Sequence, residues 1–325
     1  MEFVDIAMRL VYPYSLWIGE CAREERIDKL LFLSRDGSLP FIMYDSLAQK
    51  KIVPDVKRHY LYVSRHSLQV AAGELSFNNH ENVVEQSKAY LKSKISTSSR
   101  IGVVDVGWNG SAVRLLSSMF PTVEFFSLYF GSHHSLNSPL KSFVGNIGLS
   151  RYFGFTELVE TLISSPDPSV KLVYKKNNKI IRDFYKQNKS VRVFQEELHA
   201  NFKKMMEAPD FKGPKILDSK SVYKFLVKLT FFPNTNNVEM LMNYEHSHSG
   251  DHDGGSRLIW LENRISSKRI YLPFWSLKAV VNSNIKFSEK ISKVAFLVLN
   301  LFIMFIKKMA GNRISKFFYL GRLRR

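Results

Sequence analysis

The chain has 325 residues, of which 45% are hydrophobic and 13% aromatic, so it is expected to form one large or two moderate globular domains rather than a disordered array. Its single cysteine, Cys21, excludes an internal disulfide and fits a reducing cytoplasm, where its apolar surroundings favour a buried side chain over a nucleophile. The net charge of +18 predicts an anionic ligand or surface. Nucleic acid is not the expected partner, because no zinc-finger spacing, RNA-binding aromatic signature or compact helix-turn-helix occurs.

The first half of the chain alternates between helical and extended patterns. Helical spacing predicts helices over 5–26, 40–49, 81–92 and 112–119, and short apolar runs predict strands over 30–33, 60–63, 101–104 and 123–130. This alternation predicts an α/β fold with a Rossmann-like parallel sheet over about residues 1–150. Beyond residue 150 the rhythm fades, and helical stretches at 191–207 and 221–232 predict a mainly helical domain over 151–290.

Three of the predicted strands stop abruptly at polar residues and glycines. The carboxyl ends of parallel strands form the edge of the sheet where α/β proteins bind ligands, so these segments predict one site. At the first strand end, Arg35 and Asp36 lie between Ser34 and Gly37. Amides of the following helix would favour a phosphate, which Arg35 could bind through two hydrogen bonds. The structural alternative is an Arg35–Asp36 ion pair that fixes the loop.

The segment after the third strand is the stronger signal. Asp105 could bind a metal ion such as Mg²⁺ or sugar hydroxyls, while Gly107 and Gly110 would let the backbone approach a ligand. Ser111 is expected to cap the next helix. The alternative is a purely structural turn. The candidate site comprises two catalytic carboxylates, Asp105 and Asp36, and a set of ligand-binding and phosphate-binding residues: Ser34, Arg35, Gly37, Ser64, Arg65, Gly107, Asn109, Gly110 and Ser111.

Four segments carry a family resemblance: FLSRDG at 32–37, YLYVSR at 60–65, VVDVGWNGS at 103–111 and, more loosely, LVETLISSPDPS at 158–169. They resemble the carboxyl-terminal region of bacterial predicted hydrolases of the haloacid dehalogenase superfamily, which are often encoded with glycosyltransferases in capsule or O-antigen gene clusters. The resemblance implies a role in surface-polysaccharide biosynthesis, a phosphorylated or nucleotide-linked sugar as ligand, and glycosyltransferases as partners.

The chain departs from that superfamily at its central motif. Haloacid dehalogenase enzymes use an Asp-x-Asp pair after an apolar strand, with the first aspartate as nucleophile and the second as general acid. Here Asp105 is followed by Gly107 at the acid position. Enzymatic phosphoester or glycosyl-phosphate chemistry and a non-catalytic scaffold for a glycosyltransferase or a separate catalytic domain are therefore both open.

A weaker alternative is a phosphoribosyltransferase-like enzyme. The order strand, acidic residue, glycines, hydroxyl and helix resembles the ribose-phosphate loop of those enzymes, where carboxylates hold ribose hydroxyls and helix-terminal amides hold phosphate. Those enzymes usually carry two adjacent acidic residues, whereas Val106 follows Asp105 here.

The carboxyl-terminal tail, 291–325, combines an apolar run with positive charge. The run at 294–306 is shorter than the roughly 20 residues that a spanning helix needs, and no acidic residue follows Glu289. Seven cations follow the run: Lys307, Lys308, Arg313, Lys316, Arg322, Arg324 and Arg325. The pattern predicts a peripheral contact with the anionic inner membrane, and a buried terminal helix is the alternative.

Overall fold

The computed structural model describes most of the first 232 residues and a few positions beyond them. The described residues are 3–75, 82–95, 98–133, 140–148, 154–177, 179–186, 189–208, 211, 213–215, 218–232, 245–246, 256–257 and 294. The predicted tail at 291–325 lies outside the described residues, except for position 294. Within the described part of the chain, no helix is long and apolar enough to cross a membrane.

A five-stranded parallel sheet forms the centre of the molecule, with strand order β2-β1-β3-β4-β5. The predicted α/β, Rossmann-like fold is therefore confirmed. Two of the strands predicted to share a sheet pair directly, from Lys29 with Ile101 to Phe32 with Val104. The bounds are β1 (Lys29–Leu33), β2 (Lys57–Leu61), β3 (Arg100–Trp108), β4 (Glu124–Ser132) and β5 (Leu140–Ser142).

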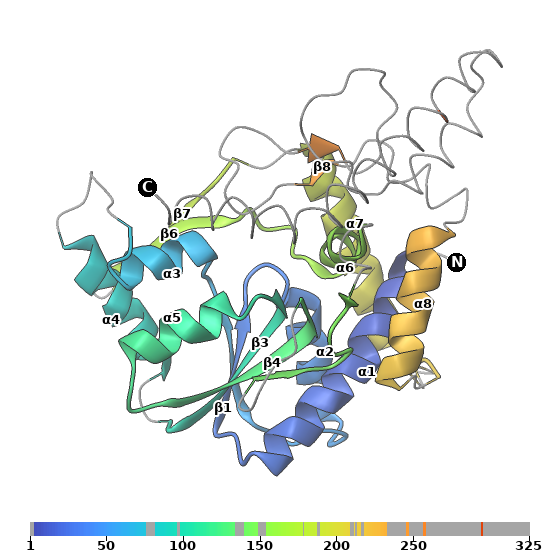
Figure 1. Cartoon of the computed structure of the whole chain (residues 1–325), viewed down its shortest axis with the longest axis horizontal. Coiled ribbons are helices and arrows are strands. Elements are labelled where there is room, and N and C mark those ends of the chain that lie inside the picture. The colour runs from blue at the N-terminus through green and yellow to red at the C-terminus, as the bar shows by residue number, and fades with distance from the viewer. Residues whose placement is uncertain are drawn as a thin grey trace, which may run out of the picture.

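Helices cover both faces of the sheet, which is why its central strands are apolar on both sides. One face packs Phe32, Val104 and Leu128 against a first group of helices, and the other packs Leu31 and Val103 against a second group. Figure 1 shows the two groups on opposite sides of the sheet. The first contains α1 (Phe3–Glu24), α2 (Ser38–Gln49), α6 (Phe155–Ile163), α7 (Lys189–Glu207) and α8 (Ser219–Phe231). The second contains α3 (Arg65–Ala71), α4 (Val83–Ile95) and α5 (Ser111–Met119).

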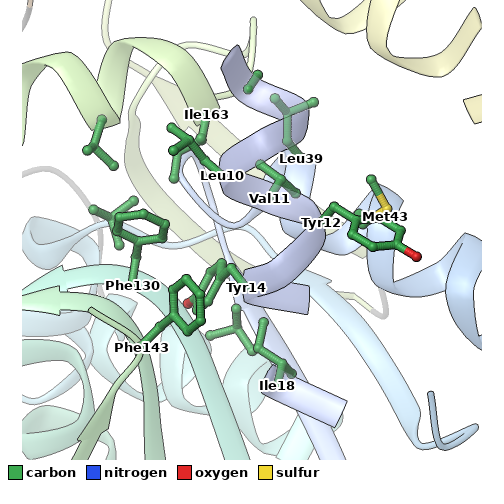
Figure 2. Packing of buried hydrophobic residues seen from close by; sticks show 14 of the residues in the cluster. Leu10, Val11, Tyr12, Tyr14, Ile18, Leu39, Met43, Phe130, Phe143 and Ile163 are labelled. Atoms are coloured by element: carbon green, nitrogen blue, oxygen red, sulfur yellow. The ribbon is translucent and has the colours of Figure 1, made fainter. Parts of the chain in front are cut away.

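Helix α1 is the most deeply buried helix of the first group. Figure 2 shows Leu10, Tyr14 and Ile18 of α1 among side chains that include Phe130 and Phe143. Burying each such large apolar side chain contributes roughly 1.5–3 kcal/mol. The Tyr14 hydroxyl lies 2.6 Å from the carbonyl oxygen of Leu128 and 2.9 Å from that of Asp105, so α1 is tied to the two central strands near their carboxyl ends.

The described residues beyond 150 pack onto this same core. Ile163 of α6, Phe202 of α7 and Leu226 of α8 belong to the hydrophobic cluster that contains α1 and α2. The predicted helices at 191–207 and 221–232 correspond to α7 and α8. Cys21 is buried, as predicted.

Several elements were not predicted, among them β5, α6, α3 and a β-hairpin. Helix α3 has seven residues, too few to establish a helical period in the sequence. A β-hairpin, β6 (Val170–Lys176) with β7 (Lys179–Phe184), interrupts the region predicted to be mainly helical. Its strand β6 packs against α3 and α4, whereas β7 is exposed along its length. The short pair β8 (Glu245–His246) and β9 (Ser256–Arg257) completes the described strands.

The third strand is longer than predicted. Instead of ending at Val104, β3 continues to Trp108, because β4 offers pairing partners out to Ser132. Asp105 and Gly107 therefore lie within the strand and not in a turn after it. The second strand lies three residues earlier than predicted at its start and ends at Leu61, so a short connection separates it from Ser64.

Candidate functional site

The strand order places two loops side by side at the carboxyl edge of the sheet. Strands β1 and β3 are neighbours, and their following helices, α2 and α5, pack on opposite faces. This is a topological switch point, where open α/β sheets bind ligands. The loop at 34–37 and the segment at 105–111 both lie at this edge, where the charge of Asp36 acts on Asp105.

The first loop is held to the end of β2. The Ser34 hydroxyl donates to the carbonyl oxygen of Val63 at 2.8 Å and accepts the Val63 amide at 3.1 Å. Gly37 is buried, and a Cβ atom there would lie 2.6 Å from the carbonyl oxygen of Leu33. Both residues therefore shape the loop, while Arg35 and Asp36 are partly exposed between them.

The segment after α6 joins this loop from the far side of the sequence. The Ser164 hydroxyl donates to the Asp36 carboxylate, and the Ser165 amide donates to the Arg35 carbonyl oxygen at 3.0 Å. His199 of α7 donates from Nε2 to the Ser164 carbonyl oxygen at 3.0 Å, and burial lowers the pKa of this histidine. The loosely matching segment at 158–169 thus lies beside FLSRDG in space.

The predicted pair Ser64–Arg65 divides into one structural and one exposed residue. Ser64 is the N-cap of α3: its hydroxyl accepts the Ser67 amide at 3.1 Å, and its amide donates to the Ser67 hydroxyl at 2.7 Å. Its hydroxyl is therefore used by a capping box. Arg65, the first residue of the helix, is exposed, and its charge lowers the pKa of Asp105.

Asp105 has the most unusual electrostatic surroundings of the site. Its Oδ1 accepts the Val106 amide at 2.9 Å. Burial, and after it the nearby carboxylates of Asp36 and Glu160, raise the pKa of Asp105 to about 7, against the opposing effects of the Val106 amide and Arg65. A carboxyl group that titrates near neutral pH can donate or accept a proton under physiological conditions.

The glycines around Asp105 bring the chain close to Tyr129. Gly107 has a φ of 97°, and a Cβ atom there would lie 2.5 Å from the Cβ and Cγ atoms of Tyr129. Gly110, with a φ of 72°, is the N-cap of α5, and as a glycine it supplies no side-chain hydrogen bond to the first amides of this helix. The prediction that Ser111 caps it was wrong, because Ser111 is already its first residue. The uncapped amides of α5 therefore remain a favourable place for an anion.

Side chains from distant elements fix the tip of this segment. Trp108, with a φ of 64°, donates from Nε1 to Oε1 of Glu160 at 2.8 Å. Its ring stacks on His133, with centroids 5.6 Å apart. His133 Nδ1 donates to the Asn109 side-chain oxygen at 3.2 Å. The Asn109 side chain therefore helps to hold the loop in place, and it is also exposed at the surface.

Sequence reasoning missed Glu160, His133 and Ser164 as members of the site. Glu160 and Ser164 lie within the loosely matching segment at 158–169, which was the available signal for them. His133 follows directly on the carboxyl end of β4, the position at which the other strands present polar residues.

The described residues contain no group of three or more His, Cys, Asp and Glu side chains that could hold a metal ion. Mg²⁺ usually binds through one or two carboxylates and the phosphates of a substrate. Asp105 and Asp36 are carboxylates of that kind, and Mg²⁺ at Asp105 stays a prediction.

Comparison with known proteins adds no identity to this geometry: no protein-family model matches the chain, and the search of curated proteins returned no match. The site is therefore interpreted from its own residues.

Proposed function

We propose that this protein binds a phosphorylated or nucleotide-linked sugar at the switch point of its sheet, as a cytoplasmic component of surface-polysaccharide biosynthesis. The observation that carries the proposal is the juxtaposition of the Asp105 segment, the uncapped start of α5 and the Arg35 loop at one sheet edge. Capsule or O-antigen synthesis, and glycosyltransferases as partners, come from the sequence resemblance alone.

The chemistry of the site supports a ligand with both phosphate and hydroxyl groups. Helix-terminal amides and the guanidinium groups of Arg35 and Arg65 favour phosphate oxygens. The carboxylates of Asp105 and Asp36 favour sugar hydroxyls or a phosphate-bound Mg²⁺. The net charge of +18 adds a long-range attraction for such an anion.

In the enzymatic version of the proposal, Asp105 is the proton-transfer group for phosphoester or glycosyl-phosphate chemistry. Its raised pKa supports such a role near neutral pH. The haloacid dehalogenase mechanism would lack its general acid, since Gly107 occupies the position of the second aspartate of the Asp-x-Asp pair. In the non-enzymatic version, the same residues hold the ligand for a partner glycosyltransferase or catalytic domain.

A phosphoribosyltransferase-like activity is the second candidate. It is supported by one geometric observation: the strand that carries Asp105 leads through Gly107 and Gly110, both at positive φ, into a helix with an uncapped amino end. A carboxylate and helix amides in that order suit a ribose bearing a phosphate. Val106 still stands where a second acidic residue would be expected.

A ligand-dependent thermal melt tests the proposal. We expect glucose 1-phosphate or a nucleotide sugar to raise the melting temperature with or without Mg²⁺, because binding at 100 times the dissociation constant adds about 2.7 kcal/mol to stability. Phosphoribosyl pyrophosphate in the same panel tests the second candidate. The Asp105→Asn variant is the control: it should lose the ligand-dependent shift and keep its fold.

The outcomes of the melt distinguish the enzymatic version of the proposal from the non-enzymatic version. A shift accompanied by product formation supports an enzyme, and a shift without turnover supports a binding module. If no phosphorylated compound shifts the melting temperature of the native protein, ligand binding at this edge is wrong.

The predicted membrane contact of the tail is a separate part of the proposal. Deleting 291–325 should abolish sedimentation with anionic liposomes while the α/β domain keeps its melting temperature, because each cation near such a surface contributes about 1 kcal/mol. A large fall in the melting temperature would instead identify the tail as part of the core.

A further inference from the structure

Aromatic side chains gather where the β6–β7 hairpin meets the end of β2. We call this group the aromatic platform, and it consists of Tyr62, His66, Arg182, Phe184 and Tyr185. Its members come from the β2–α3 connection, from the start of α3 and from the end of the hairpin, more than 100 positions apart in the sequence. Three of them are partly exposed, while Phe184 and Arg182 are exposed.

The platform is fixed in place by several contacts. The Arg182 guanidinium carbon lies 4.0 Å from the centroid of the Tyr62 ring. Phe184 meets Tyr62 nearly edge-on, with centroids 6.4 Å apart. The base of the hairpin is held by His66, which donates from Nδ1 to the Lys171 carbonyl oxygen at 3.0 Å. Because these side chains are already held in place, they lose little conformational entropy when a flat ligand binds to them.

The strand β7, which carries Arg182 and Phe184 of the platform, also exposes other apolar side chains. Ile180, Ile181 and Phe184 of β7 are among the few exposed large hydrophobic residues of the described chain, with Phe184 36% exposed. Such a concentration on a folded protein indicates a surface that another molecule covers. The neighbouring cations Lys179 and Arg182 favour an occupant that also carries negative charge.

The platform and the proposed phosphate site share one short segment of the chain. Arg65, the exposed cation whose charge acts on Asp105, lies between Tyr62 and His66 along the chain. A ligand whose phosphate contacts Arg65 would place its next flat group against the platform.

We propose that the aromatic platform binds the nucleobase of a nucleotide-linked sugar whose phosphates lie at Arg65 and the switch point. This inference rests on the proposed function and narrows it to nucleotide sugars. A base stacks on an aromatic ring or on an arginine plane whatever its sequence identity, and alanine substitution of such a ring typically weakens binding by about tenfold.

Calorimetric titration with UDP-glucose, GDP-mannose and glucose 1-phosphate tests the inference. We expect the native protein to bind at least one nucleotide sugar more than tenfold tighter than glucose 1-phosphate. Phe184→Ala should remove most of that difference and leave the affinity for glucose 1-phosphate unchanged. Val193→Ala, at an exposed position on α7, is the matched control and should change neither affinity. Arg182→Met provides a second variant if Phe184→Ala does not fold.

Each outcome decides between the alternatives. Equal affinity for glucose 1-phosphate and the nucleotide sugars overturns the platform and leaves the proposed function standing. Equal weakening of all three ligands in Phe184→Ala shows that the platform holds the sugar, and also overturns the inference. Failure of every ligand to bind the native protein overturns the proposed function itself.

Discussion

The amino and carboxyl edges of the sheet shift the pKa of an aspartate in opposite directions. At the amino edge, the Asp28 carboxylate accepts the amides of Ser99 and Arg100, each at 3.1 Å, and these hydrogen bonds lower its pKa. At the carboxyl edge, burial and neighbouring carboxylates raise the pKa of Asp105. One aspartate is held by donors that favour its charge, and the other is held where its charge is disfavoured.

Other charges at the amino edge are also compensated. Lys141 pairs with Glu25 at 2.6 Å, and Arg100 pairs with Glu124. The ammonium group of Lys29, although buried, donates to the carbonyl oxygen of Lys94 at 2.7 Å, at the end of α4. Cations near a helix carboxyl end are favourable. The comparison teaches that this protein uses charge for stability at one edge and, at the other, keeps a carboxylate whose charge burial disfavours, which is typical of a functional site.

The substitution with the largest expected effect tests whether the backbone at the carboxyl edge is fixed by close packing. Gly107→Ala should lower the free energy of unfolding by roughly 3 kcal/mol or more, because the new Cβ atom would overlap Tyr129 at a positive φ. Gly73→Ala is the matched control, since Gly73 has a φ of 74° with nothing within 4 Å of the added atom. It should cost only about 1 kcal/mol. Equal losses in urea denaturation would contradict the close packing of the Asp105 segment.

Removing the buried cation tests the amino edge. Lys29→Met should destabilise the protein by about 2 kcal/mol, because the substitution leaves the terminal carbonyl groups of α4 without their donor. Burial lowers the pKa of Lys29, so the cost of burying its charge offsets part of the hydrogen-bond contribution, and this cost diminishes as the pH rises above the lowered value. Chemical denaturation at pH 7 measures the loss. A variant as stable as the native protein would remove Lys29 from the stabilising network.

Asp105→Asn should stabilise the protein, unlike the two substitutions above. Because the folded pKa is raised, ionisation of Asp105 opposes folding, and this cost grows as the pH rises from about 4 to about 7. The variant should therefore gain on the order of 1–2 kcal/mol at pH 8, after allowance for partial exposure, and almost nothing at pH 4. Denaturation curves at both pH values measure the difference. A variant that is less stable at pH 8 would show that the Asp105 charge is compensated after all.

Asp28→Ala should have the smallest effect on stability, and its pH dependence should be opposite in sign to that of Asp105→Asn. Its pKa is lowered in the folded state, so the carboxylate contributes stability above its unfolded pKa and loses it as the pH falls through the folded value. The variant should cost about 1 kcal/mol at pH 7, the typical contribution of such exposed hydrogen bonds, and less near pH 3. The same loss at both pH values would assign the effect to side-chain packing and not to charge.

The sequence predicted the parallel sheet well because its strands are encoded locally. Runs such as 30–33 and 101–104 are apolar on both faces, which few other structures accommodate. The hairpin at 170–184 was missed although Val170, Leu172 and Tyr174 alternate with other residues, because its second strand is exposed and its apolar residues do not alternate regularly with polar ones. The helix cap was assigned to Ser111 instead of Gly110 because a left-handed φ cannot be told from composition alone.

By itself, the sequence determined four of the five strands of the sheet and that their polar ends lie at one edge, since both follow from apolar runs of known length and from the parallel arrangement. Only the tertiary structure decided the chemistry of that edge. Ser164 reaches Asp36 across 128 positions of the chain, and Glu160 reaches Trp108 across 52. The raised pKa of Asp105 depends on burial and on carboxylates brought by such distant segments, and no local pattern encodes that proximity.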